Sequence, residues 1–555
     1  MTEQIFGIDL GTTYSCVSGF DENGKNIVFT NQFGDATTPS VLVFKKGSVA
    51  IGNDAKNEAA ISPKNTIMCV KRSIGTDRTF QPGTRDVFRS ETVSAFILKK
   101  LVKDVKDEHG VDVRRAVITC PAYFGINERE ATKRAGELAG LDVVSIINEP
   151  SAAAFYYGID KNAPGQEKNV LVYDLGGGTF DVTVIRITDT EVEVLSTGGD
   201  AHLGGVDWDE AIAQHFIDKL ASQYRLDAED IKADPEFMMD LLQKAEVAKR
   251  MLTQSEKTSS SFSYHDNRCT VQLSRDEFEA ITGSMIDQTI ALCDNVVSES
   301  GIAKSSISEV LLVGGSSRMP QVSRAVEGWF GRAPKLCNPD EAVARGAALY
   351  EQQTAIKEIV EQDTGLSLFD EDGDTLTLSG VAGTLSSSAK NDILTLTGTT
   401  IEKKKLLMIT NVCSKSFGEE CIDNADPEKK RKIVINIIKK NSKLPITKED
   451  TFNTIVDNQT SVRFFPVENE SMNHQVDPED CVVLGEFNLT GLPPGRPKGR
   501  PLKAQFTLNE QGLLKVLYTD VETGLKINGE LQTTHVISDD EMRVARKQLS
   551  SYVVE

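Results

Sequence analysis

Asp9-Leu10-Gly11-Thr12-Thr13 and Asp174-Leu175-Gly176-Gly177-Gly178-Thr179 are two copies of one glycine- and threonine-rich turn. Each copy follows a short apolar run, at 5–8 and 170–173, and each leads into further strand-like sequence. Glycine lets backbone N–H groups approach a phosphate closely, and threonine hydroxyls add hydrogen-bond donors. Two such turns, each between two strands, predict two related lobes that hold one nucleotide from both sides. The alternative is a pair of ordinary hairpin turns.

The composition predicts a soluble protein with two or three domains. A chain of 555 residues is too long for one core, and its hydrophobic content is 39%. The net charge of −21 argues against nucleic acid or an anionic membrane as the main partner. Nine scattered cysteines without a CxxC pair favour reduced thiols in the cytoplasm. The first strand is expected too close to the N-terminus for a signal peptide, and no apolar run could span a membrane.

Two regions with different secondary structure follow each other along the chain. Up to about residue 355 strands alternate with amphipathic helices, for example a helix over 128–141 that ends at Gly140. Beyond residue 359 the sequence alternates Thr, Leu and Val between turns, which predicts an all-β region. Near the end, Ser538 and Glu541 form a capping box for a short helix over 538–548.

Several further positions are candidates for contacts with a nucleotide. On the helix over 241–253, polar side chains fall on one face, which by itself is typical of a solvated helix. These residues are Glu246, Lys249, Arg250 and Thr253. The turn formed by Gly314, Gly315, Ser316 and Arg318 is a candidate for a base or ribose contact, although its composition alone indicates only a loop.

Two charged residues are candidates for catalysis. Lys71 could stabilise negative charge that develops at a γ-phosphate, or it could be half of a surface basic pair with Arg72. Glu149 could orient a water molecule or Mg²⁺ at a strand end, or it could be a plain helix N-terminal acid. The acidic stretch 370–374 lacks the spacing and the closing Glu of a calcium loop and is interpreted as an acidic turn.

The order of these motifs resembles the 70-kilodalton heat-shock chaperone family, which is built on the actin and sugar-kinase fold. The resemblance covers most of residues 3–352. It rests on both phosphate turns and on five further motifs, namely Val117-Ile118-Thr119-Cys120-Pro121-Ala122-Tyr123-Phe124, Ile147-Asn148-Glu149-Pro150-Ser151, His202-Leu203-Gly204-Gly205, Val313-Gly314-Gly315-Ser316-Ser317-Arg318 and Asn338-Pro339-Asp340-Glu341.

The resemblance implies a role for each candidate. Lys71, Glu149, Asp174 and Thr179 match the family's hydrolysis residues, and Asp9 and Asp174 match the magnesium side. The phosphate contacts would come from Gly11, Thr12, Thr13, Gly176, Gly177, Gly178, Gly204 and Gly205. The nucleoside pocket would be formed by Glu246, Lys249, Arg250, Thr253, Gly314, Gly315, Ser316, Arg318 and Asp340. The implied cofactors are ATP or ADP and Mg²⁺, with K⁺ as a further candidate.

The second region resembles the family's peptide-binding sandwich. The matching segments include Ile437-Ile438-Lys439-Lys440-Asn441 and Asp457-Asn458-Gln459-Thr460-Ser461-Val462. By position, Phe452, Val462 and Phe464 would line the peptide groove. The alternative is that they are sandwich core.

The sequence departs from the family pattern in several places. The segment between Gly75 and Glu91 is short, a β-like stretch over 365–401 has no counterpart, and the helical lid is expected to be missing because few residues follow Leu531. A linker at 407–412, behind three lysines at 403–405, replaces the family's acidic one. Ser145 and Asn411 stand where family members commonly have Arg and Asp, so a generic J-domain partner is expected to stimulate this chain poorly.

These observations predict an α/β actin-like, hexokinase-type two-lobed ATPase domain over 1–355. A β-like insertion or linker over 356–405, a β-sandwich over 406–535 and a short C-terminal helix over 536–555 follow. The predicted function is that of an ATP-hydrolysing cytoplasmic chaperone for extended apolar polypeptides, with a dedicated co-chaperone or exchange factor as a further partner. The alternatives are a nucleotide-dependent scaffold for one dedicated partner and, less favoured, a small-molecule kinase.

Overall fold

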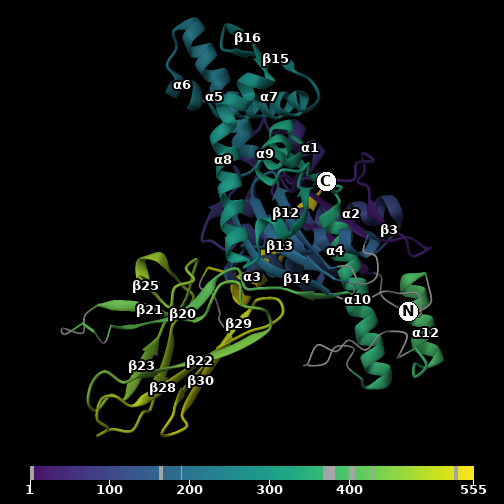
Figure 1. The fold of residues 1–555 in the computed structure, drawn as a ribbon. Coiled ribbons are helices and arrows are strands. Elements are labelled where there is room, and N and C mark those ends of the chain that lie inside the picture. The colour runs from purple at the N-terminus through teal and green to yellow at the C-terminus, as the bar shows by residue number, and fades with distance from the viewer. Residues whose placement is uncertain are drawn as a thin grey trace.

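The computed structural model of the chain describes residues 5–161, 167–188, 191–366, 382–398, 407–423, 425–426, 431–530 and 535–555. A two-lobed N-terminal body lies above a β-sandwich (Figure 1). Among these described residues, no helix is both long and apolar enough to cross a membrane.

Each lobe is built on a sheet whose central hairpin carries one of the two predicted turns. In lobe I, β1 (Ile5–Asp9) pairs antiparallel with β2 (Tyr14–Phe20), and in lobe II β12 (Lys168–Leu175) pairs antiparallel with β13 (Phe180–Ile187). Lobe I has the order β11-β10-β1-β2-β3 and lobe II the order β18-β17-β12-β13-β14-β19. Both turns therefore connect strand to strand, as predicted, and the two sheets share one topology.

The remaining strands of these sheets are β3 (Asn26–Phe29), β10 (Arg115–Cys120), β11 (Asp142–Asn148), β14 (Glu191–Asp200), β17 (Ile307–Val313), β18 (Lys335–Leu336) and β19 (Met408–Thr410). Small additional strands are β4 (Thr38–Pro39), β5 (Leu42–Phe44), β6 (Ser48–Ile51), β7 (Thr66–Ile67), β8 (Thr79–Phe80), β9 (Phe88–Arg89), β15 (Lys257–Tyr264) and β16 (Asn267–Ser274).

The helices bury their apolar faces against these sheets. Those of the N-terminal body are α1 (Asn53–Glu58), α2 (Ser90–His109), α3 (Ile126–Ala139), α4 (Glu149–Lys161), α5 (Gly205–Tyr224), α6 (Ala228–Lys232), α7 (Pro235–Gln254), α8 (Arg275–Glu299), α9 (Pro320–Phe330) and α10 (Ala342–Thr364). The helix α3 ends at Gly140 in a left-handed conformation, as predicted. Between the lobes, α4 and α10 cross so closely that a Cβ on Gly346 would lie 1.8 Å from the carbonyl oxygen of Ala152.

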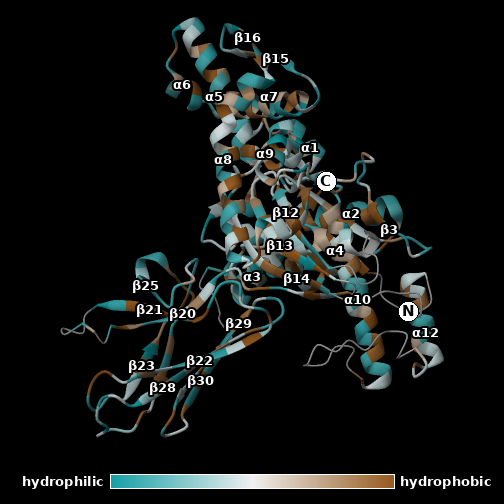
Figure 2. Cartoon of the chain, viewed as in Figure 1, coloured by the Kyte–Doolittle hydropathy of each residue, from teal (hydrophilic) through white to brown (hydrophobic). Residues whose placement is uncertain are grey.

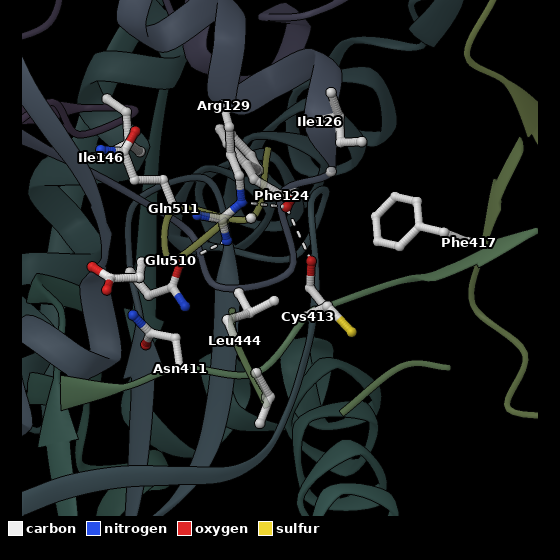
Figure 3. A pocket seen from close by; sticks show the side chains of 15 residues that line it. Phe124, Ile126, Arg129, Ile146, Asn411, Cys413, Phe417, Leu444, Glu510 and Gln511 are labelled. Atoms are coloured by element: carbon white, nitrogen blue, oxygen red, sulfur yellow. Dashed lines mark hydrogen bonds between the residues drawn. The ribbon is translucent and has the colours of Figure 1, made fainter. Parts of the chain in front are cut away.

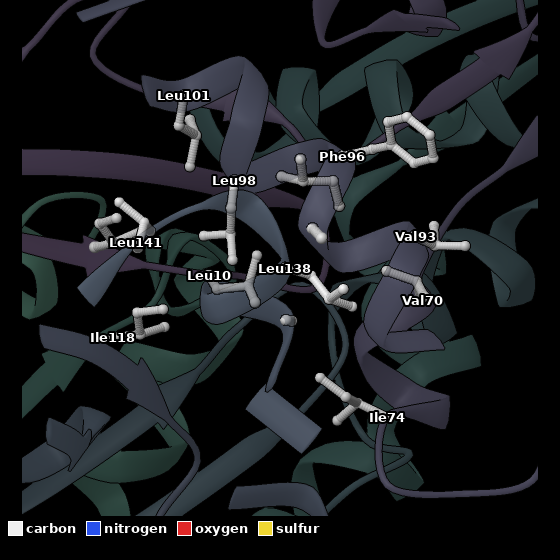
Figure 4. Close-up of a cluster of buried hydrophobic side chains, with 14 of the residues drawn as sticks. Leu10, Val70, Ile74, Val93, Phe96, Leu98, Leu101, Ile118, Leu138 and Leu141 are labelled. Atoms are coloured by element: carbon white, nitrogen blue, oxygen red, sulfur yellow. The ribbon is translucent and has the colours of Figure 1, made fainter. Parts of the chain in front are cut away.

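The core of lobe I forms between its sheet and the helices α2 and α3. Figure 4 shows Leu98 and Leu101 of α2 and Leu138 of α3 around Leu10 and Ile118. A separate core in lobe II packs α5, α7 and α8 against β12 and β13. Brown, hydrophobic segments gather around β12 and β13 in the middle of the body (Figure 2). Two cores, one under each turn, hold the turns in fixed positions.

The predicted β-like stretch over 365–401 was wrong where the structure describes it. The helix α12 (Ser387–Thr397) lies there, capped by the Ser386 hydroxyl. Its buried residues Ala389 and Ile393, four positions apart, pack against Ile356 and Val360 of α10. The helix α10 itself runs through residue 355 to Thr364, so the predicted domain boundary falls inside a helix. The acidic stretch 370–374 and the lysines 403–405 lie outside the described residues.

The second region is a β-sandwich, as predicted. One sheet has the order β25-β21-β20-β24-β26 and the facing sheet the order β22-β28-β29-β30, with β23 and β27 as a separate pair. The strands are β20 (Ser416–Ile422), β21 (Lys432–Ile438), β22 (Ile446–Asn453), β23 (Ser461–Phe464), β24 (Pro466–Asn469), β25 (Gln475–Val476), β26 (Val482–Val483), β27 (Phe487–Thr490), β28 (Pro501–Leu508), β29 (Leu514–Asp520) and β30 (Lys526–Glu530). Residues 408–410, assigned to this domain by the prediction, instead form β19 of the lobe II sheet.

The chain ends inside the N-terminal body (Figure 1). The helix α13 (Asp539–Ser551) has the predicted capping box of Ser538 and Glu541. After it, β31 (Val553–Val554) pairs with β6, and Val536, Ile537 and Met542 belong to the lobe I core. The N-terminal body is thus made from two segments that are far apart in the sequence, and not from residues 1–355 alone.

A carboxylic acid lies inside the sandwich, and none of the described residues forms an ion pair with it. Glu419 is 1% exposed and accepts hydrogen bonds from the Phe465 N–H at 2.5 Å and the Tyr518 hydroxyl at 2.7 Å. Burial raises the pKa of Glu419 to about 8 from an ordinary value of 4.5. The folded sandwich therefore holds a proton that the unfolded chain releases between these two pH values.

We expect the sandwich to lose stability as the pH rises from about 5 to 8, because the unfolded state binds fewer protons than the folded state over this range. In Glu419→Gln the amide oxygen can accept from the Phe465 N–H and the amide NH2 can donate to the Tyr518 oxygen, so the pH dependence should largely disappear. Pulse proteolysis in urea at pH 5.5 and 8.5, with sandwich peptides identified by mass spectrometry, measures the stability. Glu420→Gln is the matched control, and an equally steep pH dependence in Glu419→Gln would contradict the assignment.

Candidate functional site

The two glycine turns meet face to face across the cleft between the lobes. A Cβ on Gly177 would lie 1.9 Å from the Thr13 hydroxyl oxygen, and a Cβ on Gly178 would lie 2.3 Å from the Thr12 methyl group. The second turn is closed by the Gly176 N–H, which donates to the Thr179 carbonyl at 3.0 Å. Only glycine allows this approach, so donors from both lobes line one space.

This space is a cavity of about 490 Å³ between the lobes. Its lining includes nearly all the predicted residues, namely Asp9, Gly11, Thr12, Thr13, Lys71, Glu149, Asp174, Gly176, Gly177, Thr179, Gly205, Glu246, Lys249, Arg250, Thr253, Gly314, Gly315, Ser316, Arg318 and Asp340. Two predicted contacts, Gly178 and Gly204, lie behind the lining. A Cβ on Gly204 would meet the Gly178 backbone at 2.5 Å, so both glycines serve the packing of the turn.

Three buried charged side chains, Lys71, Glu149 and Asp174, lie in the cavity together with the half-buried Asp9. The Lys71 ammonium, held in the turn η2 (Val70–Ser73), donates to Glu149 at 2.5 Å. Asp9 comes from lobe I and Asp174 from lobe II. Burial and the charge of Glu149 raise the pKa of Asp9 to about 7 and that of Asp174 well above its usual range. Burial lowers the pKa of Lys71, but Glu149 and Asp9 together hold it above its ordinary value.

The acid cluster fits a divalent cation. Asp9, Asp174 and Glu149 surround the Lys71 ammonium. The pKa values of Asp9 and Asp174 are raised, mainly by burial and next by the negative charge of Glu149. Mg²⁺ prefers oxygen ligands and keeps several waters, so it needs only one or two carboxylates. Among the described residues no cluster of three or more metal-ligand side chains forms a closed cage. Asp9 and Asp174 therefore fit a water-shelled magnesium ion.

The helix α7 supplies one wall of the outer cavity, as the polar stripe predicted. Glu246 pairs with Lys56 of lobe I at 2.5 Å, and the Arg250 guanidinium donates to the Tyr14 hydroxyl at 2.7 Å and lies 5.1 Å from the ring centre. Lys249 points inward and bonds Asp209 at 2.8 Å and the Gly205 carbonyl at 2.6 Å. The Thr253 hydroxyl donates to the Lys249 carbonyl of its own helix.

The turn η4 (Gly315–Arg318) forms the opposite wall. Gly314 precedes it with φ +79°, and a Cβ there would lie 2.4 Å from the Asp174 carboxylate. Arg318 forms an ion pair with Asp340, and both side chains remain about half exposed at the cavity mouth. Because Gly314 has no side chain, this wall can lie directly against the Asp174 carboxylate of the acid cluster.

Sequence reasoning missed several residues of the site, among them Tyr14, Lys56, Arg72 and Asp209. Tyr14, Lys56 and Asp209 line the cavity, and Arg72 bonds the Gly178 carbonyl at 2.9 Å and forms an ion pair with Asp207 at 2.5 Å. Tyr14 directly follows the first turn, which is a usable signal. Lys56 and Asp209 stand in ordinary helical sequence, and only the closure of the lobes brings them to the cavity.

The predicted peptide groove is partly filled by the sandwich core. Phe464 is 3% exposed and stacks on Tyr518 with ring centres 4.0 Å apart. Phe452 and Val462 are half-buried at the edge of the same core. The alternative that these positions are core therefore holds for Phe464, whose side chain is covered by the facing sheet.

The sandwich and the segment that enters it contact lobe I at a small pocket (Figure 3). The Ser414 hydroxyl donates to the Phe124 carbonyl at 3.0 Å, and Arg129 behind it donates to the same carbonyl and to Asn148. Asn411 accepts from the Ser151 hydroxyl at 2.9 Å. The segment that enters the sandwich is therefore bonded to the loop before α3 and to α4, the helix that begins with Glu149 of the cavity.

Comparisons with known proteins agree with this geometry. The sequence model of the Hsp70 protein family matches residues 5–86, 81–412 and 396–555. The chaperone protein DnaK of Halobacterium salinarum is 34% identical over 565 aligned residues, which cover 100% of this chain and 79% of that protein. The chaperone protein DnaK of Thermotoga neapolitana is 33% identical over 551 residues, covering 98% of this chain and 82% of that protein.

Arg250 and Arg318 stand on opposite walls of the cavity mouth, and we expect their joint replacement by Ala to weaken ATP binding by more than about tenfold through the loss of two cationic contacts. Isothermal titration calorimetry measures the affinity. Arg324→Ala, on α9 and paired with Glu279 away from the cavity, is the control. If the double variant bound ATP with unchanged affinity, the polar residues of α7 would be only a solvated helix face.

Proposed function

The chain belongs to the Hsp70 family of ATP-dependent chaperones, and from that premise we propose how its own residues bind the nucleotide, cleave it and hold a client. The observation that carries the proposal is the meeting of two turns above one buried acid–lysine cluster. It supports a role for both turns as phosphate donors beside Lys71, Glu149 and Asp174, which line the same cavity.

Phosphoryl transfer requires positioning and electrostatic stabilisation more than covalent chemistry by the protein. The backbone N–H groups of both turns and the hydroxyls of Thr12, Thr13 and Thr179 hold the phosphates. When bound, Mg²⁺ neutralises phosphate oxygens, with Asp9 and Asp174 as its anchors through water. Lys71 steadies the attacking water and the charge that develops on the phosphate.

Glu149 has a positioning role in this proposal. Its carboxylate holds the Lys71 ammonium at 2.5 Å, and both side chains are nearly inaccessible to solvent. A buried ammonium without this partner would lose much of its charge, because burial favours the neutral form. Glu149 therefore keeps Lys71 protonated where the phosphate arrives, and Thr179 orients the water beside it. K⁺ as a second cation and a cytoplasmic location belong to the same proposal.

The client-binding site is proposed to lie on the sandwich beside Phe452 and Val462. Both side chains are half-buried and keep apolar surface available, whereas Phe464 supports them from the core. Extended apolar polypeptides are the proposed clients, and ATP turnover measured with and without a library of apolar peptides tests this role. If ATP turnover responded only to one tightly bound partner and not to the peptides, the result would support the scaffold alternative.

The turnover should depend strongly on Lys71. We expect Lys71→Ala and the volume-conserving Lys71→Met to lower turnover at least about a hundredfold, roughly 2.7 kcal/mol of transition-state stabilisation, while nucleotide still binds. Single-turnover hydrolysis and calorimetry on the same preparations separate the two effects. Lys64→Ala, an exposed lysine outside the cavity, is the control. A Lys71 variant with wild-type turnover would rule out the assigned role.

A generic J-domain protein should stimulate this ATPase poorly. Ser145 stands where the family commonly has an Arg, and the loss of one cation at a desolvated contact costs about 2–5 kcal/mol of association. Ser145 is 9% exposed, so Ser145→Arg also needs a thermal melt to verify folding. Steady-state ATP turnover with the J-domain protein is measured for the unmodified protein and for Ser145→Arg. Ser550→Arg, at an exposed position, is the control. Several-fold stimulation of the unmodified protein would contradict the expectation.

A further inference from the structure

The last residues of the sequence are built into the core of lobe I. Val536, Ile537, Met542, Ala545 and Leu549 are all at most 8% exposed, and they share one hydrophobic cluster with Phe44, Phe88 and Phe96. On the same helix, Val544 faces solvent with 57% exposure. The helix α13 therefore has one apolar face, and lobe I covers it.

Tyr552 fastens the end of this segment. Its ring lies against three phenylalanines of lobe I, with centres 5.5 Å from Phe44, 5.9 Å from Phe88 and 6.1 Å from Phe96, and its hydroxyl donates to Asp86 at 2.7 Å. Such edge-on aromatic pairs add to the stabilisation from burial.

The following strand β31 completes the edge of a sheet. The Val553 N–H donates to the Gly47 carbonyl and the Glu555 N–H to the Val49 carbonyl, both at 3.0 Å. The order of this sheet is β31-β6-β5-β7, so β31 satisfies backbone groups of β6 that would otherwise form an open edge.

The start of the segment is held by polar contacts to the same lobe. Arg89 donates to the His535 carbonyl, the Ile537 N–H donates to the buried Glu91 carboxylate at 3.0 Å, and Arg134 pairs with Asp539 at 3.0 Å. These contacts begin only a few residues after the last sandwich strand, β30. The sandwich is thereby attached to lobe I at its C-terminal end.

The opposite end of the sandwich is attached to lobe II. The strand β19 pairs parallel with β14, and Leu407 and Val412 on either side of it are each 3% exposed in the core between α4, α10 and the lobe II sheet. The sandwich is thus held at both chain ends. Lobe II and the Ser414–Phe124 contact hold its N-terminal end, and lobe I holds its C-terminal end.

We propose that residues 535–555 form a permanent strap that keeps the sandwich on the N-terminal body in every nucleotide state. Detachment would expose five apolar side chains, Tyr552 and a sheet edge at once, whereas the strap makes no contact with the nucleotide cavity. A bound nucleotide therefore does not release the sandwich from lobe I.

Hydrogen exchange on the unmodified full chain tests whether the strap stays in place. With ADP and with a non-hydrolysable ATP analogue, each shown by calorimetry to be bound, the amides of Ile537, Val553 and Glu555 should keep the same protection within about threefold. A loss of more than about tenfold in one state would overturn the proposal. Failure to bind nucleotide would appear in the calorimetry and would count against the proposed function, not against the strap.

A distance measurement tests whether the strap holds the sandwich. Fluorophores placed through noncanonical amino acids at the exposed positions Glu108 and Lys498 should report the same separation with both nucleotides. In Tyr552→Ala the distribution of separations should broaden and become nucleotide-dependent. The control Val544→Ala, on the exposed face of α13, should give the same separation as the unmodified chain. An unchanged separation in a Tyr552→Ala protein whose strap amides have lost protection would overturn the proposal. If Tyr552→Ala does not fold, the exchange data on the unmodified chain decide.

Discussion

The contact between Thr12 and Thr13 of one lobe and the bare backbone of Gly178 and Gly177 of the other sets the geometry of the whole site. A single Cβ on Gly177 would fall 1.9 Å from the Thr13 hydroxyl oxygen and force the lobes apart. Because the turns can touch, Lys71 of lobe I can lie beside Asp174 of lobe II, and α7 can reach Lys56 across the cleft. Two hydrophobic cores and the close helix crossing at Gly346 hold these turns in position.

The buried charges beneath the turns are unfavourable for folding and useful for chemistry. Asp9, Asp174 and Glu149 are taken out of water with only the Lys71 ammonium to compensate them. Removing charges from water without full pairing destabilises a protein, and such groups persist where a ligand supplies the missing charge. A magnesium–nucleotide complex would bring that positive charge together with phosphates for the turns and for Lys71. Stability and function are therefore linked at this cluster, because a bound ligand stabilises the folded state.

The sandwich is joined to this machinery by short-range contacts at both of its ends. Asn411 bonds Ser151 on the helix that begins with Glu149, and Ser414 bonds the loop before α3. At the other end, α13 and β31 are part of lobe I. Within the sandwich, the stack of Phe464 on Tyr518 fills the position that the sequence assigned to a groove. Phe464 is therefore part of the sandwich core and does not line a groove.

The sequence by itself determined the features that depend on neighbouring residues. These include the two strand–turn–strand motifs, the cap of α3 at Gly140, the capping box of α13, and an all-β second region, because each is fixed by local backbone requirements. Nearly all of the residues that short motifs predicted for the site also line the cavity. The tertiary structure alone decided that 387–397 is a helix, since its apolar face is stabilised only by α10. It also decided that Tyr14, Lys56 and Asp209 join the site, that Phe464 is core, and that the last residues complete lobe I. All of these depend on burial against segments far away in the chain, and the free energy of such contacts is not encoded in any local pattern.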